Sequence, residues 1–325
     1  MPLIDKKYDQ LFLNDDYLTD PMLMALAWKK AHNYIRTTNW YADNFELDKS
    51  SLNLDEHCKD WVKEVKSSNL KFSPLELVPA PKTSAWEFKN EYLSPRKYSD
   101  PLFDPELETL ESSEFCIDWY PSDPEKLRLR PLAHIGIKEQ TIMTLVMMCL
   151  ANDVETAQGD PSIAYDDVHE KGVVSYGNRL YCKYADNKAE HSFGATTAFS
   201  KFFADYRTFL NRPYYFASQE KPEISSDEEI YLVELDLKQF FDLVKRDKLI
   251  EKIRLIAKDQ ELYTPDKQGF VNEVLSAFEN WSWSGKTGGN YALCGTADVS
   301  DPPNGLPQGL VASGFLANIY MLEFD

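Results

Sequence analysis

Residues 235–242 read Leu-Asp-Leu-Lys-Gln-Phe-Phe-Asp, and residues 305–309 read Gly-Leu-Pro-Gln-Gly. The first stretch overlaps the end of an apolar run at residues 231–237. The high β-propensity of that run predicts a strand. The first stretch places the carboxylate of Asp236 at the end of that strand, with two phenylalanines shortly after it. The second stretch predicts a stiff glycine–proline turn that fixes the direction of the Gln308 amide ahead of an apolar helix.

The composition is that of a globular protein. A chain of 325 residues can bury one large core or two modest ones, and 43% of its residues are hydrophobic and 13% aromatic. No apolar stretch approaches a membrane span, and the first residues lack the pattern of a secretory signal. The five cysteines are scattered without the paired spacing of a zinc site, so we expect reduced thiols and a cytoplasmic protein without a membrane partner.

The formal net charge of −18 argues against a surface that is basic throughout, as in many proteins that bind phosphate backbones. Acidic residues are dense in the first third of the chain, whereas residues 238–258 are locally basic. Binding depends on local charge, so the average does not exclude a nucleic-acid partner.

Apolar spacing predicts a largely helical chain. Helices are expected after the Asp20–Pro21 cap and over residues 54–65, 138–152, 196–210, 247–258, 270–281 and 313–324. Residues 282–303 are rich in glycine and are expected to form a loop. Helices together with one clear strand favour an α+β fold over a regular alternation of strand and helix.

Asp236 has the residue type and the predicted place of a metal ligand. Nucleotidyl transfer uses divalent cations held by carboxylates, and magnesium is often bound by one or two carboxylates together with phosphate oxygens. The alternative is an aspartate that caps the turn after a strand, and Asp236 taken alone would favour that alternative.

In this order, the two stretches resemble the first two palm motifs of a reverse transcriptase, and Leu-Ala-Asn-Ile-Tyr at residues 316–320 matches the continuation of the second motif. The resemblance implies that Asp236 binds both magnesium ions, helped by the carbonyl oxygen of Leu237. It implies that Phe241 lies under the sugar of the incoming nucleotide and excludes a 2′-hydroxyl, and that Gln308 packs near that nucleotide.

Core packing is the alternative for both phenylalanines. For Phe240 we favour it, with the ring pointing away from Phe241 if the segment stays extended.

Two upstream stretches resemble the arms of the fingers hairpin in group II intron and retron-like reverse transcriptases. They are residues 78–82 (Val-Pro-Ala-Pro-Lys) and residues 130–135 (Arg-Pro-Leu-Ala-His-Ile). The resemblance implies that Lys82 and Arg130 contact the triphosphate, with an insertion of about 45 residues between the arms. A solvated surface lysine is an equally good interpretation of Lys82.

Residues 175–180 (Ser-Tyr-Gly-Asn-Arg-Leu) stand where the family has a glycine-containing fingers strand. Arg179 is a candidate phosphate contact, with a structural ion pair as an equal alternative. This stretch and the long N-terminal region resemble the bacterial defence-associated "unknown group" of reverse transcriptases.

The family's third palm motif, a Tyr-x-Asp-Asp turn that supplies a further metal-binding carboxylate, does not occur before the sequence stops at Asp325. The upstream pair Asp166–Asp167 is interpreted as loop carboxylates. We therefore expect a helical N-terminal extension at residues 1–75, fingers with an insertion at 76–230, and the first part of a palm at 231–325, without the third motif and the thumb.

The implied function is RNA-directed DNA polymerase activity of a bacterial antiviral defence protein, using Mg²⁺ and deoxynucleoside triphosphates. Its partners would be an RNA template, which could be a dedicated non-coding RNA, the DNA product, and a protein partner or second copy. The fragment alone is expected to be inactive. Two alternatives stay open: a non-catalytic palm-fold subunit that binds nucleic acid or protein, and a template-independent DNA polymerase.

Overall fold

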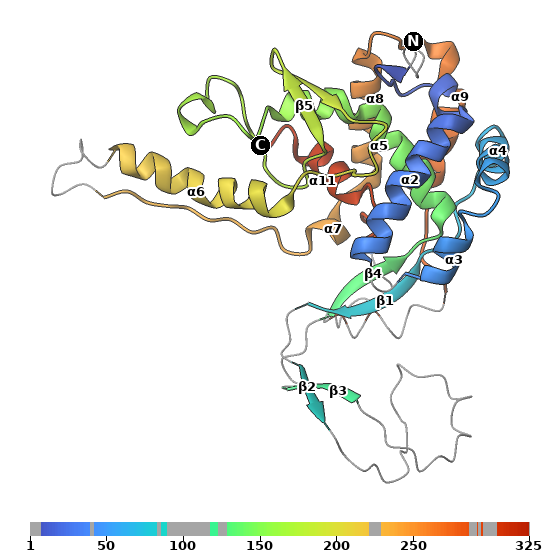
Figure 1. Cartoon of the computed structure of the whole chain (residues 1–325), viewed down its shortest axis with the longest axis horizontal. Helices are drawn as coiled ribbons and strands as arrows, with labels where there is room; N and C mark the ends of the chain where they lie inside the picture. The colour runs from blue at the N-terminus through green and yellow to red at the C-terminus, as the bar shows by residue number, and fades with distance from the viewer. Residues whose placement is uncertain are drawn as a thin grey trace. The chain divides into compact units, whose positions relative to one another are not determined.

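The chain folds as two units. The computed structural model, drawn in Figure 1, describes residues 8–39, 42–82, 86–89, 118–122, 129–220, 229–285, 291, 294 and 304–324. The larger unit contains Met1–Ser73, Ile135–Trp281 and Asn304–Asp325, and the smaller unit contains Pro74–His134 and Ser282–Pro303.

The larger unit is built mainly of helices. They are α1 (Asp15–Leu18), α2 (Pro21–Thr38), α3 (Asn44–Lys49), α4 (Leu54–Val65), α5 (Ile137–Gln158), α6 (Phe202–Glu220), α7 (Phe240–Leu243), α8 (Arg246–Asp259), α9 (Gly269–Glu279) and α11 (Ser313–Met321). Its described residues also form two short 3₁₀ turns, Tyr165–Asp167 and Pro265–Lys267, and one antiparallel ribbon of β5 (Cys182–Ala185) with β6 (Lys188–His191).

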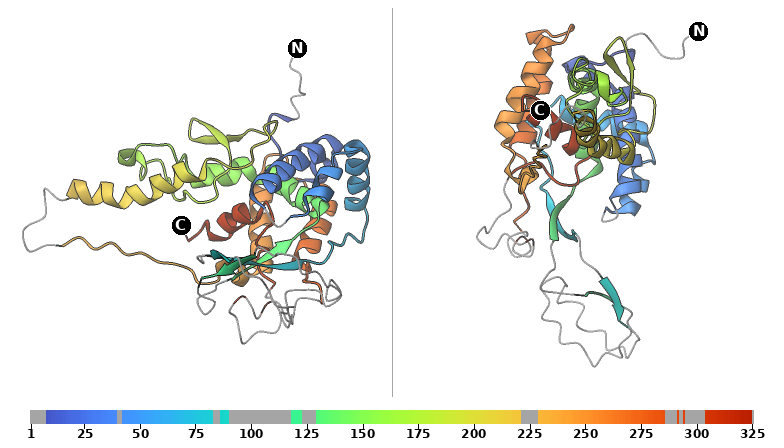
Figure 2. Two further views of the ribbon diagram at one scale, coloured as in Figure 1. Left: turned by 60° about the horizontal axis from the view of Figure 1, so that its bottom comes forward. Right: turned by 90° about the vertical axis from the view of Figure 1, so that its left-hand side faces the viewer.

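Helix α5 is the centre of the larger unit. It is buried on all sides through most of its length, as expected for a helix that is apolar around its whole circumference. Helix α2 and strand β6 pack against it (Figures 1 and 2). Helix α2 begins as predicted, because the side chain of Asp20 accepts hydrogen bonds from the backbone amides of Met22 and Leu23.

The smaller unit is built on two antiparallel ribbons. Strand β1 (Glu76–Pro81) pairs with β4 (Leu129–His134), and β2 (Trp86–Lys89) pairs with β3 (Asp118–Pro121). In the sequence, β2 and β3 both lie between β1 and β4. The combination of helices with small antiparallel sheets confirms the α+β class.

The chain divides after Ser73, close to the expected boundary at residue 75, but the first 73 residues belong to the larger unit and are not a separate extension. The amide of Leu13 donates a 2.7 Å hydrogen bond to the side-chain oxygen of Gln260, and Gln268 donates one of 3.1 Å to the Leu13 carbonyl oxygen. The carboxylate of Asp15 accepts hydrogen bonds from the first amides of α9. These contacts place the N-terminal segment in one unit with α8 and α9, in place of a separate extension.

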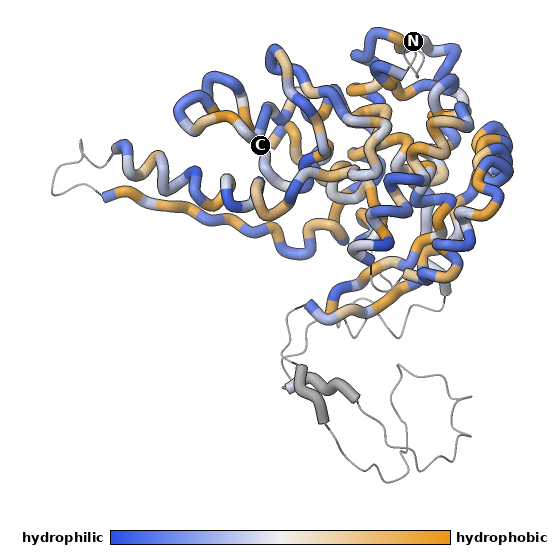
Figure 3. The backbone as a smooth tube through the Cα atoms, viewed as in Figure 1, coloured by the Kyte–Doolittle hydropathy of each residue, from blue (hydrophilic) through white to orange (hydrophobic). Residues whose placement is uncertain are grey.

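The strand expected at residues 231–237 does not form among the residues that the structure describes. The segment is extended, but no backbone hydrogen bond to another described residue holds it. The side chains of Tyr231, Val233 and Leu235 are 79%, 76% and 80% exposed, and Figure 3 shows the hydrophobic character of this segment. Propensity and apolar pattern identify a segment that can form a strand, but a strand needs a partner to hydrogen-bond with.

Within the described ranges of the chain, none of the helices combines the length and the apolar composition needed to span a membrane.

Candidate functional site

The turn at residues 305–309 packs directly on α7. The amide of Leu306 donates a 2.7 Å hydrogen bond to the carbonyl oxygen of Phe241. Gly305 lies so close to Phe241 and Asp242 that a methyl group on its Cα would overlap their backbone carbonyls. Glycine is therefore required at residue 305 by close approach of two backbones.

A side-chain hydrogen bond also joins these two motifs. Nε2 of Gln308 donates to Oδ1 of Asp242 at 3.2 Å, across 66 positions of sequence. Burial raises the pKa of Asp242, and the hydrogen bond from Gln308 opposes that effect by stabilising the carboxylate. The two motifs that sequence analysis singled out thus form one site.

Two polar side chains fix the far end of the turn, one from α5 and one from the residue that follows α2. The carbonyl oxygen of Gly309 accepts hydrogen bonds from Nε2 of Gln140 at 2.8 Å and from Nδ2 of Asn39 at 3.1 Å. The same Gln140 accepts from the amide of Val311 at 2.8 Å. Oγ of Ser313 donates to the carbonyl oxygen of Pro307 at 2.7 Å. The direction of Gln308 is consequently fixed by the core of the unit and not by the turn alone.

Arg246 holds the beginning of the turn. Its side chain is buried, and its Nε donates to the carbonyl oxygen of Gly305 at 2.8 Å. Its Nη1 donates to the carbonyl oxygens of Phe278, at 3.2 Å, and Trp281. Burial lowers the pKa of Arg246 to about 10. Arg246 belongs to the basic stretch at residues 238–258, but its spacing with the buried residues Leu249 and Ile253 puts it on the apolar face of α8.

Residues 175–180 meet the helix that follows the turn. Nδ2 of Asn318 donates to the carbonyl oxygen of Gly177 at 2.8 Å. A methyl group at Gly314 would overlap the side chain of Asn178, so α11 and this stretch touch through a small residue. Residues 175–180 therefore pack against α11, the helix that follows the turn at residues 305–309.

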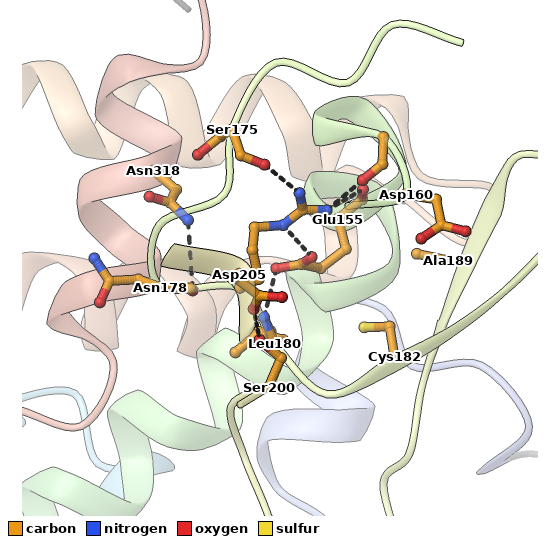
Figure 4. A network of polar contacts seen from close by, with 12 residues as sticks. Glu155, Asp160, Ser175, Asn178, Leu180, Cys182, Ala189, Ser200, Asp205 and Asn318 are labelled. Atoms are coloured by element: carbon orange, nitrogen blue, oxygen red, sulfur yellow. Dashed lines mark hydrogen bonds and ion pairs between the residues drawn. The ribbon is translucent and has the colours of Figure 1, made fainter. Parts of the chain in front are cut away.

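Arg179 forms a buried ion pair and is not exposed for contact with a phosphate. The residue is 1% exposed, and its Nε donates to Oε2 of Glu155 at 2.8 Å. Nη2 donates to the hydroxyl of Tyr184 at 2.7 Å, and the other carboxylate oxygen of Glu155 accepts from the amide of Leu180 at 2.9 Å. Figure 4 shows the network around Glu155. A guanidinium fully enclosed in this way cannot reach a solvent-borne phosphate.

Asp236 and Leu237 lie on the extended segment before α7, with both residues exposed. Within the described part of the chain, no group of three His, Cys, Asp or Glu side chains is placed to hold a metal ion. Asp236 and the Leu237 carbonyl are therefore an incomplete ligand set for a metal centre.

Phe241 and Phe240 belong to a helical turn and not to an extended segment. Their rings make a T-shaped contact, with centroids 5.8 Å apart and an interplanar angle of 78°. Phe240 packs toward Tyr320 of α11, with a centroid distance of 6.2 Å. Both are half-buried, so the alternation that would have pointed Phe240 away from Phe241 is absent.

Lys82 and Arg130 belong to the smaller unit. The two arms expected to form a hairpin do pair, with Ala80 opposite Arg130 and Pro81 opposite Leu129. Lys82 directly follows β1, so both cations lie at the same end of the ribbon, and both are exposed. That placement brings the two candidate triphosphate contacts together.

Comparisons of the chain with protein-family models, with curated proteins and with solved structures found no match.

Proposed function

We propose that this chain forms the fingers and the first part of the palm of an RNA-directed DNA polymerase. The observation that carries the proposal is the contact between α7 and the turn at residues 305–309. Two stretches that resemble consecutive palm motifs meet through the Leu306–Phe241 and Gln308–Asp242 hydrogen bonds, and glycine is required where their backbones touch.

The proposal gives each side chain a role that its chemistry suits. Phe241 lies under the sugar of the incoming deoxynucleotide, and its ring leaves no room for a 2′-hydroxyl. Gln308 supports that nucleotide from a turn whose geometry is set before the substrate arrives, which lowers the entropy lost on binding. Arg130 and Lys82 neutralise charge on the triphosphate, Arg130 as a planar fork and Lys82 as a mobile point charge.

Magnesium is assigned to Asp236 and the carbonyl oxygen of Leu237, together with a further carboxylate that the described residues do not supply. Hard oxygen ligands of this kind are those that Mg²⁺ prefers. The template is RNA, the product is DNA, and the role in antiviral defence follows from the same resemblance.

A second candidate is a palm-fold subunit that binds nucleic acid or protein without catalysis. The net charge of −18 favours it. In that case Asp236→Ala leaves function intact, whereas loss of exposed lysines abolishes it.

The test is primer extension by the full-length natural gene product, with an RNA template, labelled deoxynucleotides and added magnesium. Asp236→Ala is compared with Asp259→Ala, an exposed carboxylate of α8 in the same unit. We expect template-dependent DNA synthesis that is lost in Asp236→Ala and retained in Asp259→Ala. Phe241→Ala should incorporate ribonucleotides, whereas Leu243→Ala, two residues further along α7, should not.

Three results would decide against parts of the proposal. Synthesis indifferent to Asp236 would remove the metal assignment. No synthesis, with RNA bound to the purified protein, would favour the non-catalytic subunit. Identical product sequences with and without template would identify a template-independent polymerase.

A further inference from the structure

One face of α6 is an exposed row of aromatic side chains, here called the α6 aromatic surface. Its members are Phe202, Phe203, Tyr206, Phe209 and Tyr214, which are 59%, 80%, 46%, 53% and 68% exposed. Helix α6 is the long yellow helix in Figures 1 and 2. A contiguous row of exposed apolar side chains has a function more often than single exposed apolar residues do.

The opposite face of α6 is half-buried and contacts other segments of the unit. The hydroxyl of Tyr165 donates to the carbonyl oxygen of Thr208 at 3.1 Å, and Nη1 of Arg212 donates to the carbonyl oxygen of Val173 at 2.9 Å. The ring of Tyr215 lies 5.0 Å from that of Tyr165. The exposed rings are thus turned away from these contacts with the described residues of the unit.

Three of the exposed rings form a stacked row, while Phe203 lies edge-on to Phe202 at an interplanar angle of 70°. Phe202 and Tyr206 have centroids 5.5 Å apart with an interplanar angle of 10°, and Tyr206 and Phe209 have centroids 6.4 Å apart at 26°. This arrangement follows from their spacing of four and three residues, which aligns side chains on one helix face. Exposed aromatic rings are side chains on which unpaired bases stack.

Positive charge accompanies the rings. Residues 201–214 contain the cations Lys201 and Arg207 beside the rings, Arg212 on the half-buried face, and one carboxylate, Asp205, in a chain whose net charge is −18. Lys201 and Arg207 are both exposed. Cations beside stacked rings favour a partner with a phosphate backbone.

The side chains of the α6 aromatic surface favour nucleic acid over protein as its partner. The other exposed apolar segment of this unit, residues 230–237, is mostly aliphatic and carries Glu234 and Asp236, which would repel phosphate. The α6 aromatic surface has the opposite combination of rings and cations. We propose that it binds single-stranded nucleic acid by stacking unpaired bases on Phe202, Tyr206 and Phe209, with Lys201 and Arg207 contacting phosphates. This inference goes beyond the proposed polymerase activity, because stacking needs no catalytic site.

The test is fluorescence anisotropy with a labelled single-stranded oligonucleotide and the full-length natural gene product, at low and moderate salt. Each of Phe202→Leu, Tyr206→Leu and Phe209→Leu keeps an apolar side chain but removes the ring, and we expect about tenfold weaker binding for each. Phe202→Trp should bind at least as well as the natural protein. Phe45→Leu is the matched control, because Phe45 is 75% exposed on α3, and it should change binding less than twofold.

The charge contribution is tested separately by Arg207→Gln, which should reduce the dependence of affinity on salt. Unchanged affinity in the three leucine variants would overturn the inference, as would equal affinity for a duplex of the same length. A further contrary result would be a natural protein that forms dimers through these rings, seen as dissociation to monomers when they are replaced by alanine. Each variant is checked for an unchanged unfolding transition, which is expected because the replaced side chains lie in solvent.

Discussion

The amide of Leu306 donates a 2.7 Å hydrogen bond to the carbonyl oxygen of Phe241, and this bond joins two turns from distant parts of the sequence. The side-chain hydrogen bond from Gln308 to Asp242 lies beside it. Around this contact, Arg246, Gln140 and Asn39 bind carbonyl oxygens at either end of the second turn. The candidate site is therefore built into the core of the larger unit.

Replacing Gly305 by alanine should separate the two turns. The added methyl group overlaps the backbone carbonyls of Phe241 and Asp242, which cannot rotate away as a side chain could. We expect the free energy of unfolding, measured in urea, to fall by about 1–3 kcal/mol, as for other overpacked sites. Gly194→Ala is the control, because an added Cβ there meets no atom within 4 Å. Equal effects of the two substitutions would show that the turns do not touch.

The Glu155–Arg179 pair should contribute to stability and not to substrate binding. Arg179→Met leaves the Glu155 carboxylate buried without its cation, which we expect to cost about 3–5 kcal/mol in the free energy of unfolding. The double variant with Glu155→Leu removes both charges and should recover much of that loss. Urea denaturation of the two single variants and the double variant measures the coupling. A stable Arg179→Met protein with a raised KM for deoxynucleotides would restore the phosphate-contact role.

Sequence predicted the helices better than the sheets, for a physical reason. Helices α2 and α4 are specified by local signals, such as the Asp20 cap and the apolar spacing over Leu54–Val65. Residues 231–237 have strand propensity, but pairing depends on a partner that local sequence does not encode. The arms β1 and β4 were expected from resemblance to a known hairpin and not from periodicity.

For the candidate site, sequence indicated the two motifs but not what positions them. Gln140 and Asn39 reach the Gly309 carbonyl oxygen from 169 and 270 positions away, and neither has a spacing that signals such a contact. Arg246 did carry a signal, because it lies on the apolar face of α8, where an arginine must find acceptors. For Arg179, sequence left ion pair and phosphate contact open, and burial decides between them.

Asp15 should stabilise α9 from the N-terminal segment. Its carboxylate accepts hydrogen bonds from the amides of Gly269, Phe270 and Val271 at 3.0, 2.9 and 3.1 Å, which places a negative charge at the start of the helix. Asp15→Ala should lower the free energy of unfolding by about 1–2 kcal/mol. Asp16→Ala removes only an exposed ion pair with Lys267 and should cost about 0.5 kcal/mol or less. If both cost the same, the N-terminal segment does not cap α9.

His191 should make the larger unit less stable in acid. Its ring is buried, and one ring nitrogen lies 3.1 Å from the Tyr181 carbonyl oxygen. Burial, followed by the nearby Lys30, lowers its pKa from 6.5 to about 3, while the hydrogen bond to Tyr181 opposes the shift. The thiol of Cys182 also faces the ring. Between these two pKa values the unfolded chain binds one more proton at this residue than the folded chain, so stability falls as the pH falls.

The measurement compares urea unfolding of the natural protein and His191→Asn at several pH values from 7 to 4. Asparagine keeps a donor for the Tyr181 carbonyl oxygen but does not take up a proton. Other acidic groups titrate alike in both proteins, so their contribution cancels in the difference. The variant is expected to be less stable at pH 7, and the gap should narrow by about 1.4 kcal/mol for each pH unit below 6.5. A constant gap for His191→Asn across this range would mean that the buried imidazole is protonated in the folded chain.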